Sequence, residues 1–375
     1  MTVQVRSFAK INLGLRIGAA REDGFHELLT VYQTIGLHDL IGVSLSRGSG
    51  VEIRCDDPRV PKDETNTCYR MVEKAMRALK GKGRVVVEIE KRLPVQGGLG
   101  GASSNAVAAL LGLELALKKK LAAEDRLGIA AEVGSDLPLF LVGGTVLGVG
   151  RGEQVYPLED LPAVACVVVT PEVGVSTPKA FAEWDRRMQG LKPARFMETD
   201  AALKRRSSTV LPGSVVASET GRLRPAWMGK GARPHTGSAA MGVEKLTLLT
   251  ASDRMVGLGR EIAAWLGESY SGAPFGRGRA ENPLLALVRA GIKNDFEQVV
   301  FPEYPELSEG KVALERARAK YASLSGSGST LYGLFVSKAA ALAAVGKLRR
   351  QGWAAQGTVT VSRREYWRKF LVSSF

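Results

Sequence analysis

The stretch Leu93-Pro94-Val95-Gln96-Gly97-Gly98-Leu99-Gly100-Gly101-Ala102-Ser103-Ser104-Asn105 places four glycines within five positions, directly before two serines. Residues 84–90 before it are rich in valine and isoleucine, which predicts a strand, and residues 106–111 after it are helix formers. Glycine lets backbone N–H groups approach a ligand closely, and the first turn of a helix adds partial positive charge. This strand, loop and helix therefore predict a phosphate-binding loop.

The loop differs from the common nucleotide-binding loops. No Gly-Lys-Ser/Thr follows its glycines, and their spacing is not Gly-x-Gly-x-x-Gly. A tight turn before a buried helix would produce the same local sequence. Residues elsewhere in the chain are therefore needed to decide between a turn and a phosphate site.

Length and composition are those of a globular protein with room for two domains. The chain has 375 residues, of which 45% are hydrophobic. Its apolar runs are too short to span a bilayer, and the chain enters an expected strand at Val3, so we expect no signal peptide. Three widely spaced cysteines lack a metal-binding spacing. A reduced, cytoplasmic protein without a membrane partner is therefore expected.

The net charge of +14 is concentrated in one stretch. Residues 186–243 hold eleven Lys or Arg but only three Asp or Glu, and they are also rich in Gly, Pro, Ser and Thr. This composition predicts a flexible basic insertion. The alternative is an RNA-binding arm, but aromatic residues do not interleave regularly with the charges, so we expect no nucleic-acid partner.

The remaining chain predicts a mixture of strands and helices. In the first strand, alternation at Ile11, Leu13 and Leu15 predicts one buried face, with Lys10 and Asn12 on the other face. A lysine there is ordinarily solvated. The other expected elements are strands at 31–45, 51–55, 163–170 and 357–361, a tight strand pair at 143–150, and helices at 66–79, 122–133, 245–266, 282–289, 310–320 and 339–350, with a further helix from Ala180.

Two more features carry possible chemistry. Asp136 lies where a helix meets the apolar run at 137–141, and the ordinary role there is that of a helix N-cap. His26 follows a turn and would by itself be a surface or capping residue. Residues 323–330 form a second loop of small residues, with Ser325-Gly326-Ser327-Gly328 at its centre.

Three of these separated motifs resemble those of the GHMP kinase family. They are Ala9-Lys10-Ile11-Asn12-Leu13, the Pro-x-x-x-Gly-Leu-Gly-x-x-Ser-Ser loop, and the Ser-Gly-Ser-Gly loop. Within the family, the chain is similar to kinases of the non-mevalonate isoprenoid pathway that act on 4-diphosphocytidyl-2-C-methyl-D-erythritol. That likeness rests on Asp23-Gly24-Phe25-His26-Glu27-Leu28, Lys91-Arg92-Leu93-Pro94, Gly100-Gly101-Ala102-Ser103-Ser104-Asn105 and Gly134-Ser135-Asp136-Leu137-Pro138-Leu139-Phe140.

The resemblance covers about residues 1–184 and 245–375 and implies an α+β fold of two domains. Residues 1–162 would form an ATP-binding domain similar to the second domain of ribosomal protein S5. Residues 163–375 would form a ferredoxin-like substrate domain that contains the basic insertion. The active site would lie in the cleft between the two domains.

The resemblance also implies the reaction, a transfer of phosphate from ATP with Mg²⁺ to the 2-hydroxyl of the substrate, which releases ADP. Asp136 would take the hydroxyl proton, and Lys10 would keep this carboxylate ionised and stabilise developing charge. The ligands of Mg²⁺ are not assigned. The expected ATP-binding residues are Asn66, Lys91, Pro94, Gly97, Gly98, Leu99, Gly100, Gly101, Ala102, Ser103 and Ser104.

The cytidine end of the substrate needs flat groups on which a pyrimidine can stack. By resemblance these are Phe25, His26 and Phe181. Two residues depart from the pattern of the family: Phe25 stands where tyrosine is frequent, and Gln96 replaces a glycine. Neither change removes a reacting group. Further expected substrate contacts are Asn12, Asn105 and Thr177.

Two alternatives stay open. A sibling GHMP kinase would act on homoserine, a sugar or mevalonate, although the Phe25-His26 pair with Lys10 and Asp136 argues against it. A protein of another class would bind RNA through an S5-like fold and its positive charge. For the kinase we expect a small-molecule substrate as the only partner, and a monomer or a homodimer.

Overall fold

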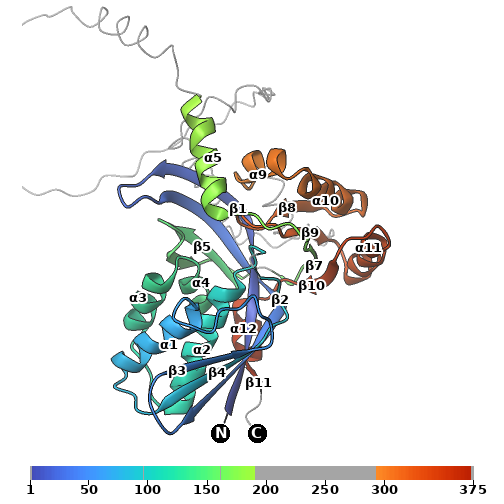
Figure 1. Cartoon of the computed structure of the whole chain (residues 1–375). Coiled ribbons are helices and arrows are strands. Elements are labelled where there is room, and N and C mark those ends of the chain that lie inside the picture. Colours follow the sequence, from blue (N-terminus) through green and yellow to red (C-terminus); the bar gives the residue numbers. More distant parts are fainter. Residues whose placement is uncertain (1, 96, 161, 191–292, 373–375) are drawn as a thin grey trace, which may run out of the picture. The chain divides into compact units, whose positions relative to one another are not determined.

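The computed structural model describes residues 2–95, 97–160, 162–190 and 293–372. Met1–Trp184 and Thr250–Phe375 together form one compact unit, and Asp185–Leu249 form a second. Of the second unit, only the residues up to Gly190 are described, as the end of a helix. The fold given below is therefore that of the first unit (Figure 1).

A seven-stranded sheet forms the first half of this unit. Its strands are β1 (Thr2–Ala20), β2 (His26–Ser46), β3 (Val51–Cys55), β4 (Arg84–Glu90), β5 (Thr145–Val149), β6 (Gln154–Pro157) and β11 (Leu371–Val372). The order is β11-β1-β2-β4-β3, while β5 pairs with β2 and β6 pairs with β5. All pairs are antiparallel except β3 with β4, which are joined by helix α1 (Thr67–Ala78).

The hairpin of β1 and β2 runs through the whole unit and carries much of the site (Figure 1). Its register shifts at three places, one of them between Asn12 and Gly14. Such bulges redirect side chains and strengthen the local twist. Ile11 and Leu13 are buried, as the alternation predicts, but Lys10 and Asn12 on the opposite face are only 3% and 1% exposed. Lys10 is therefore not the solvated strand residue that was its ordinary alternative.

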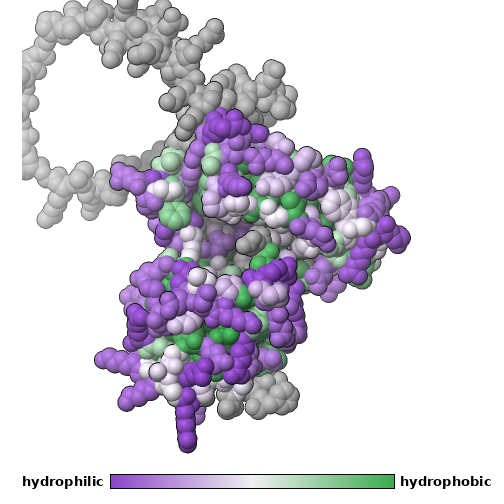
Figure 2. All heavy atoms as spheres, viewed as in Figure 1, coloured by the Kyte–Doolittle hydropathy of each residue, from purple (hydrophilic) through white to green (hydrophobic). Residues whose placement is uncertain are grey.

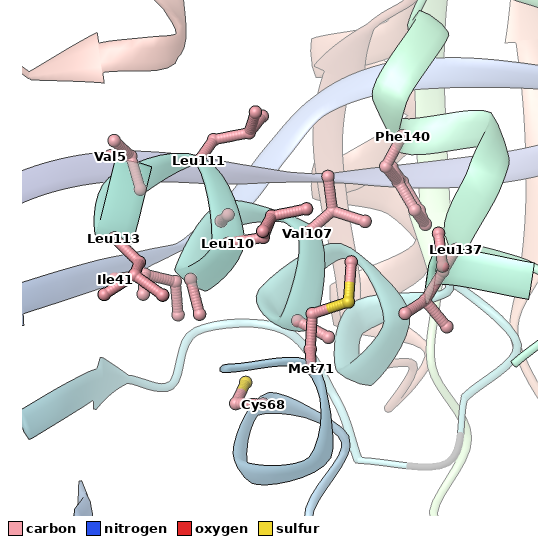
Figure 3. Close-up of a cluster of buried hydrophobic side chains, with 14 of the residues drawn as sticks. Val5, Ile41, Cys68, Met71, Val107, Leu110, Leu111, Leu113, Leu137 and Phe140 are labelled. Atoms are coloured by element: carbon pink, nitrogen blue, oxygen red, sulfur yellow. The ribbon is translucent and has the colours of Figure 1, made fainter. Parts of the chain in front are cut away.

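Helix α2 (Gly101–Leu117) lies behind the sheet and forms the centre of the first hydrophobic core. Every residue from Ser104 to Glu114 is buried, because α2 packs on β1 and β2 on one side and on α1 on another. Val107 and Leu110 of α2 share this core with Met71 of α1 (Figure 3). Helices α3 (Ala123–Val133) and α4 (Leu137–Val142) complete the layer. The glycine-rich loop therefore leads into a firmly held helix.

A four-stranded antiparallel sheet forms the second half. It has the order β10-β7-β9-β8, with β7 (Ala165–Val169), β8 (Tyr321–Leu324), β9 (Leu331–Phe335) and β10 (Ala355–Val359). Its helices are α5 (Thr177–Gly190), α9 (Glu297–Glu303), α10 (Pro305–Arg316) and α11 (Lys338–Arg350). Helices α10 and α11 both contact β9. This strand order and connection are ferredoxin-like, as expected.

A second hydrophobic core joins the two sheets. Ile11 and Leu13 of β1 and Val31 and Ile35 of β2 pack with buried residues of the small sheet, namely Cys166, Val168, Tyr332 and Leu334. The two sheets are thus tied together by the hairpin that carries Lys10. The face shown in Figure 2 is largely hydrophilic, as expected for surface that water covers.

The C-terminal residues return to the first sheet, which the sequence did not predict. Helix α12 (Arg363–Phe370) packs through Tyr366, whose hydroxyl donates to the Phe140 carbonyl at 2.8 Å. Strand β11 then pairs with β1. The amphipathic pattern of α12 is only eight residues long, which gave it little weight beside the longer helices.

Most other expected elements are confirmed within a few residues. The strand pair expected at 143–150 is wrong, because this stretch holds only β5, whose partner β6 begins at Gln154. The helices expected at 245–266 and 282–289 and the insertion beyond Gly190 lie outside the described residues. The domain boundary at residue 162 stays a prediction. Among the described helices, none has the length and apolar character needed to cross a bilayer.

Candidate active site

One cavity of about 820 Å³ brings together segments that are far apart in the sequence. The glycine-rich loop, the β1–β2 hairpin and the residues before α1 supply its walls on one side. The start of α5 and the loop at 326–328 supply the other. The volume lies in the range of small-molecule and cofactor sites.

The two small-residue loops touch each other backbone to backbone. Gly98 has φ +79°, and a Cβ placed on it would lie 2.2 Å from the Ser325 carbonyl oxygen. A Cβ on Gly328 would lie 2.5 Å from the Gly98 nitrogen. The Ser325 hydroxyl donates to the Gly98 carbonyl at 3.0 Å, and the Thr330 N–H donates to the Gly97 carbonyl at the same distance. Only glycine fits these positions, so the loops fix one another.

The first turn of α2 faces the cavity, with Lys91 beside it. Gly100 precedes the helix at φ +69°, and a Cβ on Gly101 would lie 3.3 Å from Lys91 Nζ. Backbone N–H groups at a helix start and a nearby ammonium group are the usual ligands of phosphate. Lys91 also donates to the buried Asp39 carboxylate at 2.6 Å.

Asp39 fixes Lys91 and the backbone of the residues that lead into the glycine-rich loop. Sequence reasoning missed this residue. Its Oδ1 accepts from the backbone N–H groups of Arg92 and Leu93, both at 2.7 Å. The side chain is completely buried, so these three donors compensate its charge. A carboxylate in the middle of a strand was the available sequence signal, since such residues are rarely buried without a partner.

Asn66 contributes to the cavity chiefly through structure. Its Oδ1 accepts from the Cys68 N–H at 2.8 Å as the N-cap of α1, and its Nδ2 donates to the Pro61 carbonyl at 2.6 Å. Both ends of the amide are therefore engaged. The residue lines the wall where it positions α1, and one Nδ2 hydrogen and one Oδ1 lone pair remain for a ligand.

Lys10 and Asp136 meet in the cavity although they are far apart in the chain. Lys10 Nζ lies 3.3 Å from Asp136 Oδ2 and donates to Asn12 Oδ1 at 2.7 Å. Asn12 in turn donates to Thr30 Oγ1 at 2.8 Å. The Lys10 side chain is 4% exposed, whereas Asp136 is 33% exposed and open to the cavity. A buried ammonium thus faces an accessible carboxylate.

Asp136 does not act as a helix cap. It occupies the N-cap position of α4, but its side chain accepts no hydrogen bond from that helix. Instead Oδ1 accepts from the Tyr32 hydroxyl at 3.0 Å, while Oδ2 faces Lys10. The ordinary alternative for this residue is therefore not supported by the geometry.

Tyr32 is a site residue that sequence reasoning missed. It is cross-strand partner to Asn12, it lines the cavity, and Lys10 Nζ lies 5.5 Å from the centre of its ring. Burial, together with the neighbouring Asp136 carboxylate, raises the pKa of Tyr32 well above its usual value. Pairing of strand 31–45 with the first strand would have placed it opposite Asn12, but the bulges in β1 hide that register from the sequence.

The expected aromatic residues lie together, in an arrangement that the sequence did not show. The rings of His26 and Phe181 are stacked, with centroids 4.9 Å apart and planes 14° from parallel. Phe296 meets Phe181 edge to face at 4.9 Å. Phe25 is 49% exposed, and the Arg151 guanidinium lies 4.9 Å from its ring centre. Arg151 and Phe296 both line the cavity and were not predicted.

The remaining predicted polar residues are Thr177, Ser104 and Asn105. The Thr177 and Ser327 hydroxyls are 2.7 Å apart, so they link the start of α5 to the second loop. Ser7 Oγ donates to Asn105 Oδ1 at 2.6 Å and accepts from the Ser104 hydroxyl, whose oxygen lies 2.8 Å away. Asn105 still lines the cavity, but Ser104 does not, because its buried side chain points into this cluster.

The segment before α9 fastens the second loop and was also missed. Asn294 Nδ2 donates to the carbonyls of Leu324 and Gly326 at 2.9 and 2.7 Å. The neighbouring Asp295 is completely buried and accepts from the Ile17 N–H and from Arg16, both at 3.0 Å. One short segment thus connects the second loop to β1. Without long-range contacts, its Asn-Asp pair is indistinguishable from an ordinary turn.

All the predicted site residues except Ser104 line this cavity. The structure therefore gathers residues between Lys10 and Gly328, far apart in the sequence, around one cavity. The cavity is also lined by residues to which the sequence analysis gave no catalytic or binding role, namely Leu15, Leu28, Tyr32, Arg59, Val60, Pro61, Thr65, Thr67, Cys68, Ile89, Val95, Ser135, Arg151, Val175, Ser176, Pro178, Phe296, Gly326, Ser327 and Gly328.

Comparison with known proteins gives one consistent result. Residues 66–144 match the family described as GHMP kinases N terminal domain, and residues 280–353 match GHMP kinases C terminal. A 4-diphosphocytidyl-2-C-methyl-D-erythritol kinase from Solibacter usitatus is 31% identical over 91% of this chain and 84% of its own.

Solved structures agree. A crystal structure of 4-(cytidine 5'-diphospho)-2C-methyl-D-erythritol kinase has a TM-score of 0.61 at 25% identity and covers 95% of this chain and 98% of its own. A homoserine kinase from Cytophaga hutchinsonii has a TM-score of 0.58 at 19% identity over 96% and 95% of the two chains, which shows the common fold alone. The chain therefore belongs to the GHMP kinase family, among its 4-diphosphocytidyl-2-C-methyl-D-erythritol kinases.

Proposed function

We propose that this kinase transfers the γ-phosphoryl group of ATP to the 2-hydroxyl of 4-diphosphocytidyl-2-C-methyl-D-erythritol, in the non-mevalonate route to isoprenoid precursors. The observation that carries the proposal is the Lys10–Asp136 pair, which lies in one cavity with the glycine-rich loop and the stacked His26–Phe181 rings. A phosphate cradle, a base and an aromatic wall are the three parts that this reaction needs.

Asp136 would act as the general base. Its partly exposed carboxylate can accept the hydroxyl proton as the phosphoryl group is transferred. Lys10 is held by Asn12 in a nearly dry position, so its charge is weakly screened. It would stabilise both the ionised carboxylate and the negative charge that develops on the transferring group.

The ATP phosphates would lie on the glycine-rich loop and the first turn of α2, next to Lys91. Magnesium fits as the ion that accompanies these phosphates, because Mg²⁺ typically binds phosphate oxygens, water and only one or two protein groups. Among the described residues, no cluster of three or more His, Cys, Asp or Glu side chains could hold a metal by itself. The Ser103 hydroxyl at the cavity wall is the group we assign to the ion, which would neutralise phosphate charge.

The cytidine would contact the wall formed by Phe25, His26 and Phe181. A stacked pair with an edge-on third ring offers a rigid, flat surface, which suits a pyrimidine better than a small aliphatic acid such as homoserine. Thr177, Asn12 and Asn105 would provide polar contacts on the substrate side. This wall favours a nucleotide-linked alcohol over the substrates of sibling kinases.

A coupled ADP-release assay tests the proposal. With Mg-ATP, the purified protein should turn over 4-diphosphocytidyl-2-C-methyl-D-erythritol much faster than homoserine or mevalonate. Cytidine diphosphate without the erythritol part is the matched control, since it fills the aromatic wall but has no acceptor hydroxyl at the reacting position. Comparable or faster turnover of homoserine or mevalonate would reject the assignment.

A further inference from the structure

Tyr32 is packed so tightly that its hydroxyl is held in a single position. The residue is 2% exposed, and its ring lies between two glycines of the neighbouring strand and turn. A Cβ on Gly148 would lie 2.5 Å from Tyr32 Cε2, and a Cβ on Gly152 would lie 2.5 Å from the hydroxyl oxygen. Both glycines are therefore needed to make room for this side chain. The same socket holds the hydroxyl 3.0 Å from Asp136 Oδ1.

The hydroxyl keeps its proton under working conditions. Burial disfavours the phenolate, and the Asp136 and Glu153 carboxylates disfavour it further, so the pKa of Tyr32 is raised well above its usual value. The other charged groups near Tyr32 and Asp136 are Lys10 and Glu153, and Arg151 Nε lies 3.8 Å from Glu153 Oε1. A neutral phenol next to a carboxylate can only donate its proton to the hydrogen bond.

We infer that Tyr32 is a positioning residue for the catalytic base: its hydroxyl occupies Oδ1 of Asp136, so that Oδ2, beside Lys10, receives the proton of the substrate hydroxyl. This inference rests on the proposed function. A carboxylate with two free oxygens could rotate between several hydrogen-bonding arrangements, whereas one held at Oδ1 presents a single oxygen. Hydrogen bonds to charged groups are among the strong ones, so this restraint is substantial.

Tyr32→Phe removes the hydroxyl and keeps the ring. We expect kcat to fall roughly tenfold or more, because a hydrogen bond to a charged group is lost. The KM values for ATP and substrate should change little, since Tyr32 is only 2% exposed and its hydroxyl is already bonded to Asp136. Tyr366→Phe is the matched control: it removes an equally buried hydroxyl that donates to a backbone carbonyl, and it should lower thermal stability while kcat is retained.

A double-mutant cycle separates positioning from general damage. If Tyr32 acts through Asp136, Tyr32→Phe should cost nothing further in an Asp136→Ala background, in kcat and in the midpoint of thermal unfolding alike. Equal losses in both backgrounds, a parental kcat in Tyr32→Phe, or an effect confined to KM would each overturn the inference. If the parent releases no ADP with this substrate, the proposed function falls, and the unfolding cycle alone still decides whether Tyr32 and Asp136 are coupled.

Discussion

Two parts of the cavity are built in different ways: the part where we propose phosphoryl transfer (the reaction end) and the part where we propose that the cytidine binds (the base end). At the reaction end, two glycine loops lock together through their backbones, and Lys10 is 3% exposed beside them. At the base end, side chains make the surface: His26 and Phe181 stack on each other, and Phe25 is 49% exposed under Arg151. At the reaction end, close backbone packing leaves the two loops no other arrangement. The base end is held in place by only a few contacts between rings.

This difference matches the demands of the two steps. Phosphoryl transfer depends on positioning and charge, and small displacements of the reacting groups are costly. Recognition of a flat base needs surface and tolerates small shifts, because stacking varies slowly with geometry. Substitutions at the reaction end should therefore lower kcat or kcat/KM for ATP. Substitutions at the base end should raise the KM for substrate.

The largest expected effect is that of Asp136→Asn at the reaction end. Asparagine still accepts the Tyr32 hydrogen bond but cannot take the proton, so kcat should fall by roughly 10²–10⁴. The midpoint of thermal unfolding should change little, because asparagine keeps the Tyr32 hydrogen bond, Lys10 keeps its bond to Asn12, and no capping bond is lost. Steady-state ADP release and a melting curve measure the two quantities. A folded variant with near-parental kcat would remove Asp136 from the mechanism, and Lys10 as its partner.

The second prediction tests whether the loops fix each other. In Gly98→Ala the new Cβ would collide with the Ser325 carbonyl at 2.2 Å, and φ +79° would strain the backbone. Because the loops must separate, kcat/KM for ATP should fall by about 10². Gly128→Ala in α3 is the control, since nothing lies within 4 Å of its Cβ. It should be fully active and more stable by up to about 1 kcal/mol.

If Gly98→Ala bound and used ATP as well as the Gly128→Ala control, the interlocked loops would have no role in holding phosphate. The reaction end would then be no more constrained than the base end, and the contrast between them would disappear.

The contrast also explains what the sequence could predict. Glycines at 97, 98, 100 and 101 are needed for backbone reasons that the local sequence expresses directly, so the loop and its helix were predicted correctly. Strand and helix periodicities predicted a mixture of both elements, and the family resemblance predicted the α+β class, which is confirmed. The family resemblance, rather than the periodicities, supplied the roles of Lys10 and Asp136, and the structure brings both into one cavity.

What the sequence missed depends on contacts between distant segments. Tyr32, Asp39 and Asn294 act through partners on other elements, and none has a local signature. Ser104 was predicted at the phosphate site because it lies in the motif, but the helix turns its side chain toward Ser7 instead. The direction in which such side chains point depends on a β-bulge or on the position within a helical turn, and a single sequence shows neither.

The third prediction moves to the base end. Phe181→Ala removes the ring that stacks on His26 and meets Phe296, so substrate KM should rise roughly 5- to 150-fold, the equivalent of about 1–3 kcal/mol for a lost stacking ring. The KM for ATP should stay the same. Phe301→Ala removes another partly buried phenylalanine, one that lies outside the cavity, and should leave substrate KM unchanged. A substrate KM equal to that of the parent would show that the stacked wall does not hold the cytidine.

The smallest expected effect concerns Phe25 and Arg151, whose cation–π contact lies at the open edge of the cavity. An exposed contact of this kind contributes about 0.5–1 kcal/mol, so Phe25→Leu and Arg151→Gln should each raise substrate KM roughly 2- to 5-fold. Arg54→Gln, which removes an exposed arginine from β3, controls for the change in net charge. If the guanidinium holds the ring in place, the double variant should be no worse than the weaker-binding single variant. Fully additive losses would mean that the two side chains contact substrate separately, and the base end would then consist of independent contacts instead of one aromatic wall.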